Sequence, residues 1–300
     1  MDTTAYEAAE QRLLARYGVR AQTRWVELRE PRMRVRLLEA GEGEPVLFIH
    51  GGGGEAVDWA PLLARLEGVR AIAVDRPGCG LSDGFSYSGV DLRSHGVSFI
   101  ESLLDAIGLD DAPVVGNSMG GLWALWAALA IPQRIRSLAL LGCPALMLDT
   151  GAPLFMHLAA TPLGDRLMLG QPSRTTARRI LADLGEAEGV VPDEMVELTL
   201  TRPADTRASF LSLIRNCISP FGRRLSFSEH EARRVLQPTL FIWGDGDPFG
   251  KVSSGRCAAH IMPAARIEVV HGGHLPWLDE PERCARLIAA HSGIAAAAMA

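Results

Sequence analysis

Short apolar runs separated by helical stretches constrain the fold of this 300-residue chain more than any other feature. The runs lie at 46–49, 71–74, 114–115 and 138–141. Continuous apolar runs of this kind are typical of parallel strands that are buried on both faces. Helical patterns lie between them, at 59–66, 98–107 and 122–130. Because crossover connections are right-handed, such helices cover both faces of a sheet, and the sequence therefore predicts a doubly wound, mostly parallel α/β architecture.

A long segment interrupts this alternation at Pro144. The strand pattern resumes only with apolar runs at 239–243 and 267–270. Residues 145–235 carry apolar side chains at helical spacing and nothing strand-like, so we expect them to form a helical cap. Insertions of this length usually serve as lids over an active site. The α/β core then consists of two ranges, residues 21–144 and 236–293.

The two ends of the chain lie outside this core. Residues 1–20 are expected to form an N-terminal helix, because apolar and charged positions follow helical spacing over 4–17. The runs at 24–28 and 35–39 predict a β-hairpin. The alanine-rich tail, 294–300, is expected to fray.

The composition excludes several classes of partner. A net charge of −5 and a pI near 5.9 provide no electrostatic attraction for nucleic acid, which favours clustered lysine and arginine. No stretch reaches the roughly 18 apolar residues of a membrane span. The cysteines are odd in number, far apart and without metal-ligand spacing, which predicts free thiols, no metal and a cytoplasmic location. They are Cys79, Cys143, Cys217, Cys257 and Cys284.

The segment Val114–Gly121 contains a G-x-S-x-G motif in the setting that its chemistry requires. An apolar strand runs into Gly116–Gly120, and a helical pattern follows directly. A nucleophile on a strained strand-to-helix turn projects its hydroxyl near a helix N-terminus, where the flanking glycines avoid Cβ clashes. Ser118 is therefore the expected nucleophile. The alternative is a glycine-rich turn in which Ser118 only caps the helix.

A serine hydroxyl is a weak nucleophile at neutral pH, so it needs a positioned base and an acid that orients this base. Two histidines, His271 and His274, follow one strand pattern, and His274 is favoured because it lies farther out in the loop. Two carboxylates, Asp245 and Asp247, follow another strand pattern. Asp247 is favoured because Asp245 suits a turn residue that stabilises its own loop. We expect Ser118, His274 and Asp247 to form a catalytic triad.

The tetrahedral intermediate of such a reaction carries an oxyanion that backbone N–H groups stabilise. The glycine-rich loop His50–Gly54 follows the first core strand, and its glycines let backbone amides approach a substrate closely. We expect the N–H groups of Gly52 and Met119 to form the oxyanion hole. A flexible loop is the alternative, and the lack of a G-x-G-x-x-G motif argues against a dinucleotide cofactor, so none is expected. Further expected substrate contacts are Gly51, Gly53, Asn117, Leu275 and, in the cap, Phe155 and Met156.

Together these motifs resemble the α/β-hydrolase superfamily. The resemblance spans residues 45–290 and rests on His50-Gly51, Asp75–Asp83, Gly116–Gly121, Trp243–Asp247 and Gly273-His274. It implies the α/β-hydrolase fold with an inserted cap. Serine at the nucleophile position argues against the haloalkane dehalogenases and epoxide hydrolases of the superfamily, which use aspartate there. The resemblance implies a structural role for the Asp75–Asp83 loop and no catalytic one.

The main functional hypothesis is hydrolysis of a small, apolar carboxylic ester through an acyl-enzyme intermediate. The Asp75–Asp83 loop looks like that of esterases and related cap-bearing hydrolases. The alternative is hydrolysis of carbon–carbon bonds in vinylogous diketone acids, because Gly116–Gly121 and the glycines at 51–54 are similar to that subfamily. A tryptophan commonly follows its catalytic histidine, whereas Leu275 stands here. A small-molecule receptor on the same fold is a third hypothesis, and the oligomeric state is not predicted.

Overall fold

Eight strands form one sheet in the part of the chain that the structure describes. The computed structural model describes residues 3–148, 150–152, 154–161, 164, 170–182, 184 and 191–292, with only the backbone at 154 and 155. The strand order is β1-β2-β4-β3-β5-β6-β9-β10. β1 and β2 form the predicted antiparallel hairpin, β2 is also antiparallel to β4, and the other neighbours are parallel, which confirms the mostly parallel sheet. The strands are β1 (Ala21–Leu28), β2 (Met33–Ala40), β3 (Glu44–Ile49), β4 (Val69–Val74), β5 (Ala112–Asn117), β6 (Ile135–Leu141), β9 (Thr239–Gly244) and β10 (Ala265–Val270).

The central strands send alternate side chains into two separate cores. In β3, Leu47 and Ile49 join one cluster of buried side chains, and Val46 and Phe48 join the other. Both faces are therefore buried, which explains the continuous apolar runs of the sequence. The first cluster is covered by α3 (Leu92–Ile107), α4 (Met119–Ala130) and α11 (Val252–Ile261). The second is covered by α1 (Thr4–Tyr17), α2 (Ala60–Leu63), α12 (Pro276–Asp279) and α13 (Pro281–His291).

Two short 3-10 turns precede elements of this core. The first, η1 (Ala56–Trp59), leads into α2, so the helical pattern predicted over 59–66 is realised as a turn and a single short helix. The second, η2 (Pro132–Arg134), leads into β6.

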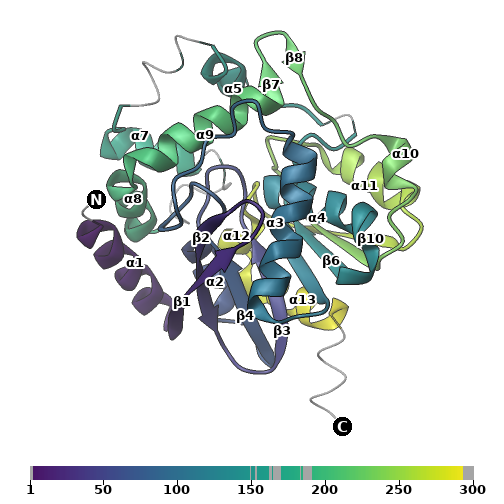
Figure 1. Cartoon of the computed structure of the whole chain (residues 1–300), viewed down its shortest axis with the longest axis horizontal. Helices are drawn as coiled ribbons and strands as arrows, with labels where there is room; N and C mark the ends of the chain where they lie inside the picture. Colours follow the sequence, from purple (N-terminus) through teal and green to yellow (C-terminus); the bar gives the residue numbers. More distant parts are fainter. Residues whose placement is uncertain are drawn as a thin grey trace.

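The segment 145–235, called the cap below, leaves the sheet after β6 and returns at β9 (Figure 1). Its helices α5, α7, α8 and α9 gather at one end of the molecule in that view. The two short strands β7 and β8 pair in register Ile218↔Arg223, which corrects the expectation that the cap holds nothing strand-like. Strands of two residues are too short to leave an alternating pattern in the sequence. The elements are α5 (Leu154–Ala159), α7 (Arg174–Ala182), α8 (Asp193–Thr201), α9 (Ala204–Cys217), β7 (Ile218–Ser219), β8 (Gly222–Arg223) and α10 (Glu229–Ala232).

The N-terminal helix α1 lies against α8 of the cap and is bound to the core through buried polar groups (Figure 1). Glu10 pairs with Arg36 in β2, and both side chains are buried. Tyr6 donates a hydrogen bond to Glu55, which directly follows the glycine-rich loop. Helix α1 is thus in contact with both the core and the cap. The tail 294–300 lies outside the described residues.

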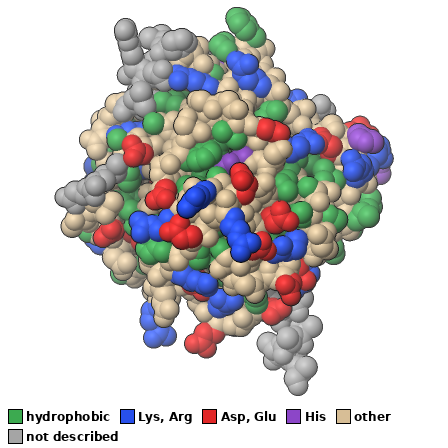
Figure 2. All heavy atoms as spheres, viewed as in Figure 1, with side chains coloured by type: hydrophobic (Ala, Val, Ile, Leu, Met, Phe, Trp, Pro, Cys, Tyr) green, Lys and Arg blue, Asp and Glu red, His purple; other side chains and the backbone are tan. Residues whose placement is uncertain are grey.

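Charged side chains of both signs are interspersed over the face of the molecule shown in Figure 2, with apolar side chains between them. Several large apolar side chains are exposed among the described residues, and Phe221, in the turn between β7 and β8, is the most exposed of them at 99%. In the described ranges, no helix is both long enough and apolar enough to cross a membrane.

Candidate active site

The turn between β5 and α4 holds Ser118 in a conformation that requires its glycine neighbours. Ser118 has φ 49° and ψ −111°, a left-handed backbone that is strained for a residue with a side chain. A Cβ on Gly116 would come within 2.8 Å of the Gly121 backbone, and one on Gly120 within 2.1 Å of the Ile49 carbonyl oxygen. Only glycine fits at these positions, and the sharp turn leaves Ser118 partly exposed at the N-terminus of α4.

His274 and Asp247 are hydrogen-bonded to each other in the loops that follow β10 and β9. His274 Nδ1 lies 2.9 Å from Asp247 Oδ2 and 3.1 Å from Oδ1. The carboxylate also accepts the backbone N–H groups of Cys143 at 2.7 Å and Phe249 at 2.8 Å. Burial alone would raise the pKa of Asp247, but the His274 ring and the two N–H groups outweigh it and hold the pKa below its usual range. The ionised carboxylate therefore keeps a proton on Nδ1 and leaves Nε2 as the basic atom.

The second aspartate and the second histidine form a separate pair at the surface. His271 Nδ1 lies 3.4 Å from Asp245 Oδ1, and their side chains are 65% and 51% exposed, against 5% and 0% for His274 and Asp247. Asp245 also accepts the N–H of Gly272 at 3.1 Å and so stabilises the loop itself. The structure therefore places Asp247 with His274 and Asp245 with His271, and the catalytic role of Asp247 stays a prediction.

Asn117 connects the turn that holds Ser118 to the loop that holds His274. Its Nδ2 donates to the carbonyl oxygen of Leu141 at 2.8 Å and to that of His274 at 3.1 Å, and the side chain is buried. Both amide hydrogens are occupied, so we propose a positioning role for Asn117 in place of the expected substrate contact.

Among the described residues, Ser118 Oγ forms no hydrogen bond. In unliganded enzymes the contact between nucleophile and base commonly tightens only when substrate binds.

The glycine-rich loop lies between Ser118 and the cap. A Cβ on Gly51 would come within 3.2 Å of Ser118 Cβ, and a Cβ on Gly52 or Gly53 would come within 3.3 Å or 3.5 Å of the Phe210 ring of α9. The N–H groups in the first turn of α4 have no partner within that helix. Gly51 is thus next to Ser118 in space, Gly52 follows it in the chain, and Met119 follows Ser118. We propose that the N–H groups of Gly52 and Met119 form the oxyanion hole. Phe210 was not predicted from the sequence, where its only signal is an apolar position in a helical pattern.

The remaining expected contacts come from the cap and from the loop after His274. Met156 is partly buried and packs against the core cluster, whereas the side chain of Phe155 lies outside the described residues. Leu275 is partly buried, and its N–H donates to the carbonyl oxygen of Leu184 in the cap at 3.2 Å. The N–H of His274 donates to the same oxygen at 2.6 Å, so the cap directly contacts the histidine loop.

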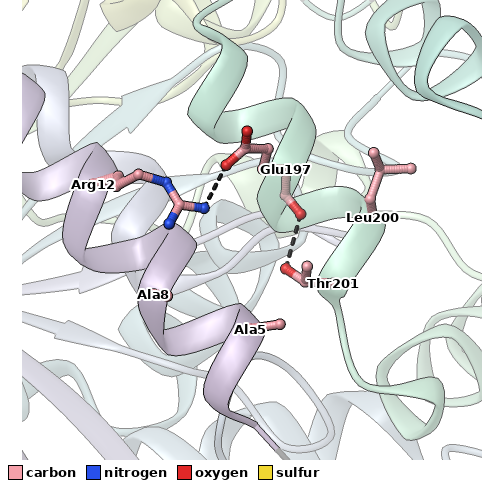
Figure 3. Close-up of a pocket in the computed structure, with 6 residues that line it drawn as sticks. All are labelled: Ala5, Ala8, Arg12, Glu197, Leu200 and Thr201. Atoms are coloured by element: carbon pink, nitrogen blue, oxygen red, sulfur yellow. Dashed lines mark hydrogen bonds and ion pairs between the residues drawn. The ribbon is translucent and has the colours of Figure 1, made fainter.

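A hollow of about 340 Å³ lies between α1 and α8, away from these residues (Figure 3). An ion pair between Arg12 and Glu197 crosses it. Its lining residues are Ala5, Ala8, Arg12, Glu197, Leu200 and Thr201. None of them belongs to the expected triad or to the glycine-rich loop, so we do not place the substrate there. Within the described ranges, no group of three or more His, Cys, Asp or Glu side chains is arranged to hold a metal ion.

Solved structures of hydrolases superimpose on most of the chain. The carboxylesterase CesB from Bacillus subtilis has a TM-score of 0.76 at 18% identity, covering 95% of this chain and 96% of that protein. A meta-cleavage product hydrolase from Pseudomonas fluorescens IP01 has a TM-score of 0.71 at 22% identity, covering 91% of this chain and 98% of that protein. At these identities the likeness shows the fold alone.

Sequence relatives are more similar. The 2-hydroxy-6-oxononadienedioate/2-hydroxy-6-oxononatrienedioate hydrolase 1 of Dechloromonas aromatica (strain RCB) is 28% identical over 89% of this chain and 94% of its own length. The 2-hydroxy-6-oxo-6-phenylhexa-2,4-dienoate hydrolase of Burkholderia cepacia is 30% identical over 79% of this chain and 82% of its own length. The pattern of the alpha/beta hydrolase family matches residues 46–287. The chain therefore belongs to the alpha/beta hydrolase family and is a hydrolytic enzyme.

Proposed function

We propose that this enzyme hydrolyses a carbon–carbon bond in a vinylogous diketone acid of the 2-hydroxy-6-oxo-2,4-dienoate class. The observation that carries the proposal is the sequence similarity to hydrolases named for such dienoates, at 28% and 30% identity over most of the chain. The carboxylesterase shares the fold at only 18% identity. The comparisons therefore favour the carbon–carbon hypothesis over the ester hypothesis, which rested on the Asp75–Asp83 loop.

The candidate site holds the groups that such a hydrolysis needs. In the proposed reaction, His274, oriented by Asp247, takes the proton of Ser118 while Ser118 Oγ attacks the ketone carbon. The N–H groups of Gly52 and Met119 stabilise the oxyanion that forms. When the carbonyl re-forms, the carbon–carbon bond breaks, and the departing carbon takes the electron pair and then the proton held by His274. Water hydrolyses the acyl-enzyme by the same steps, so the products are a carboxylic acid and a protonated carbon fragment.

Ester hydrolysis and carbon–carbon hydrolysis share the attack on a carbonyl and differ in the leaving group. An alkoxide carries its electron pair on oxygen, whereas a carbanion leaves readily only when a conjugated carbonyl spreads its charge. A 2-hydroxy-6-oxo-2,4-dienoate meets this requirement once it tautomerises to its 2-oxo form, in which the hydroxyl proton has moved to C5. The 2-oxo group, conjugated through the remaining double bond, then accepts the electron pair of C5 as an enolate. The same triad therefore suits both reactions, and the bond that breaks depends on which leaving group the substrate carries.

A dienoate substrate carries a carboxylate, and Arg207 in α9 is the positive group that we propose to bind it. Arg207 lies one turn before Phe210, so both side chains project from the same side of the helix. Its Nη1 donates to the carbonyl oxygen of Arg202 at 3.2 Å. Its buried Nε has no hydrogen-bond partner among the described residues. Phe210 covers the glycine-rich loop, and its shared helix face with Arg207 supports the proposal that Arg207 faces the site.

The proposal is tested by comparing substrates on the purified enzyme. We expect a larger kcat/KM for 2-hydroxy-6-oxo-6-phenylhexa-2,4-dienoate, followed by the loss of its dienol absorbance, than for p-nitrophenyl esters from acetate to octanoate. Ser118→Ala should abolish both activities, and a fluorophosphonate probe should label the wild type but not this variant. Fast ester turnover with an untouched dienoate would restore the ester hypothesis. No turnover of either, together with no labelling, would point to the receptor hypothesis.

A further inference from the structure

The Asp75–Asp83 loop contains a buried arginine that its turn does not require. Asp75 organises the turn, because its carboxylate accepts the N–H groups of Ala56 at 2.7 Å and Leu81 at 3.0 Å and pairs with Arg36 at 2.9 Å. Arg76 points instead toward the glycine-rich loop and is fully buried. Among the described residues, no carboxylate pairs with it. A buried cation without an anionic partner is costly unless other groups compensate its charge.

The compensating groups are three consecutive backbone carbonyls of the glycine-rich loop. Arg76 Nε donates to the carbonyl oxygen of His50 at 3.0 Å, and Nη2 donates to those of Gly51 at 2.6 Å and Gly52 at 3.0 Å. On its other side, the guanidinium lies 4.9 Å from the ring centroid of Trp123 in α4. Such a planar, forked donor matches several acceptors at once in a way that a lysine does not.

We propose that Arg76 is a positioning residue that orients the oxyanion-binding N–H groups of the glycine-rich loop, an inference that rests on the proposed serine-hydrolase chemistry. In a trans peptide, the C=O of one residue and the N–H of the next point in opposite directions. By holding the Gly51 and Gly52 carbonyls, Arg76 turns the N–H groups of Gly52 and Gly53 away from itself. Its positive charge at the carbonyl end also polarises these peptides and strengthens the N–H groups as donors.

His50 supports the same arrangement from within the loop. Its Nε2 accepts the backbone N–H of Arg76 at 3.0 Å, and its Nδ1 lies 2.8 Å from the Gly51 carbonyl oxygen. Because a carbonyl only accepts, Nδ1 carries the proton and Nε2 does not. Burial, followed by the charge of Arg76, lowers the pKa of His50 well below its usual range, so the ring stays neutral and keeps this tautomer. Arg76 and His50 therefore hold the Gly51 carbonyl from two directions.

The test compares Arg76→Met and Arg76→Lys with Arg134→Met. Arg134 is a matched control, because it also donates to loop carbonyls, those of Asp110 at 2.5 Å and Leu109 at 3.0 Å, but in the loop that precedes β5. The substrate is whichever of the dienoate or the ester the wild type hydrolyses, so the outcome does not depend on which bond is cleaved. kcat, KM, the melting temperature and the inhibition constant of an aryl trifluoromethyl ketone are measured. This ketone forms an oxyanion when Ser118 attacks it.

We expect Arg76→Met to lower kcat by about 10- to 100-fold, somewhat less than loss of an oxyanion-hole donor itself, with KM within about threefold of the wild type. The ketone should bind more weakly by the same factor as kcat/KM falls, because both depend on the oxyanion. Arg76→Lys should recover part of the loss, and Arg134→Met should keep kcat and ketone affinity. If Arg76→Met does not fold, kcat and the ketone affinity of Arg76→Lys are compared with those of the wild type instead. Unchanged ketone affinity, or an equal loss in Arg134→Met, overturns the proposal.

Discussion

Two aspartate–histidine pairs lie near each other after β9 and β10, and their surroundings give them different properties. Asp247 and His274 are buried, and the carboxylate is surrounded by hydrogen-bond donors that favour its charged form. Asp245 and His271 are exposed, so solvent screens their interaction. At the scale of single residues, burial therefore separates the pair suited to orient a base from the pair that stabilises a loop.

This difference predicts unequal effects of two conservative substitutions. Asp247→Asn should lower kcat by about 1,000-fold or more, because an amide no longer holds the proton of His274 on Nδ1. Asp245→Asn should change kcat by less than about threefold, because it alters only an exposed loop contact. Steady-state kinetics and thermal melting of both variants provide the measurement. Losses of similar size would contradict the assignment of Asp247.

At the scale of elements, α9 is the part of the cap that covers the glycine-rich loop. Phe210 lies over Gly52 and Gly53, and Leu213, one turn later, approaches Gly52 as well. The cap also contacts the histidine loop through the Leu184 carbonyl. We therefore propose that the cap forms the roof of the substrate pocket, with an apolar surface directly above the candidate oxyanion hole.

Phe210→Ala should change substrate preference more than it changes stability. The ring is partly exposed, so its removal leaves a smaller cavity in the core than a fully buried phenylalanine would. The ratio of kcat/KM between a 6-phenyl and a 6-methyl substrate should shift by about tenfold, as expected when a pocket changes by a few methylene groups. Phe221→Ala, at the exposed hairpin tip of the same cap, is the control and should leave the ratio unchanged. If both variants keep the wild-type ratio and only Phe210→Ala has a lower melting temperature, Phe210 packs the cap and does not contact the substrate.

At the scale of the whole molecule, buried charges join α1, the glycine-rich loop and the cap. Glu55 accepts a hydrogen bond from Tyr6 in α1 and pairs with Arg202, which follows α8. Asp58 is partly buried beside it and accepts the Glu55 N–H at 2.9 Å. Burial, followed by the charge of Glu55, raises the pKa of Asp58 to about 7. Asp58 therefore holds a proton in the folded protein over a pH range in which the unfolded chain has lost it.

This proton makes stability depend on pH in a defined window. Between about pH 4, where an unfolded aspartate titrates, and about pH 7, the folded state binds one more proton than the unfolded state. The free energy of unfolding should therefore fall as pH rises, by at most about 1.4 kcal/mol per pH unit from this group, and level off above about pH 7. Asp58→Asn keeps an acceptor for the Glu55 N–H but does not titrate. The free energy of unfolding of both proteins is measured by chemical denaturation from about pH 5 to 8.5. The wild-type value minus the variant value should decline up to about pH 7 and then become constant. A difference that stays constant over the whole range would refute the expectation.

The amino-acid sequence determined the elements whose signals are local. Strands buried on both faces leave continuous apolar runs, so β3, β4, β6 and β9 were predictable from hydrophobicity alone. The strained turn at Ser118 excludes side chains at its neighbours, so its glycines are visible in the sequence. Asp247 and His274 were predicted to interact because each follows a strand in a loop of small or polar residues, and the structure brings them into contact.

Only the tertiary structure decided which distant groups meet. Arg76 follows an aspartate in a glycine-rich turn, where a charged residue is typical of a solvated loop, and its contacts lie about 25 residues earlier in the chain. Phe210 had the same apolar signal as many other positions in the cap, and its place over Gly52 depends on how α9 crosses the site. The β7 and β8 strands are too short to produce an alternating pattern of apolar and polar residues in the sequence. Hydrophobic periodicity records whether a side chain is buried, whereas the identity of its neighbours is set by packing between elements that are far apart in sequence.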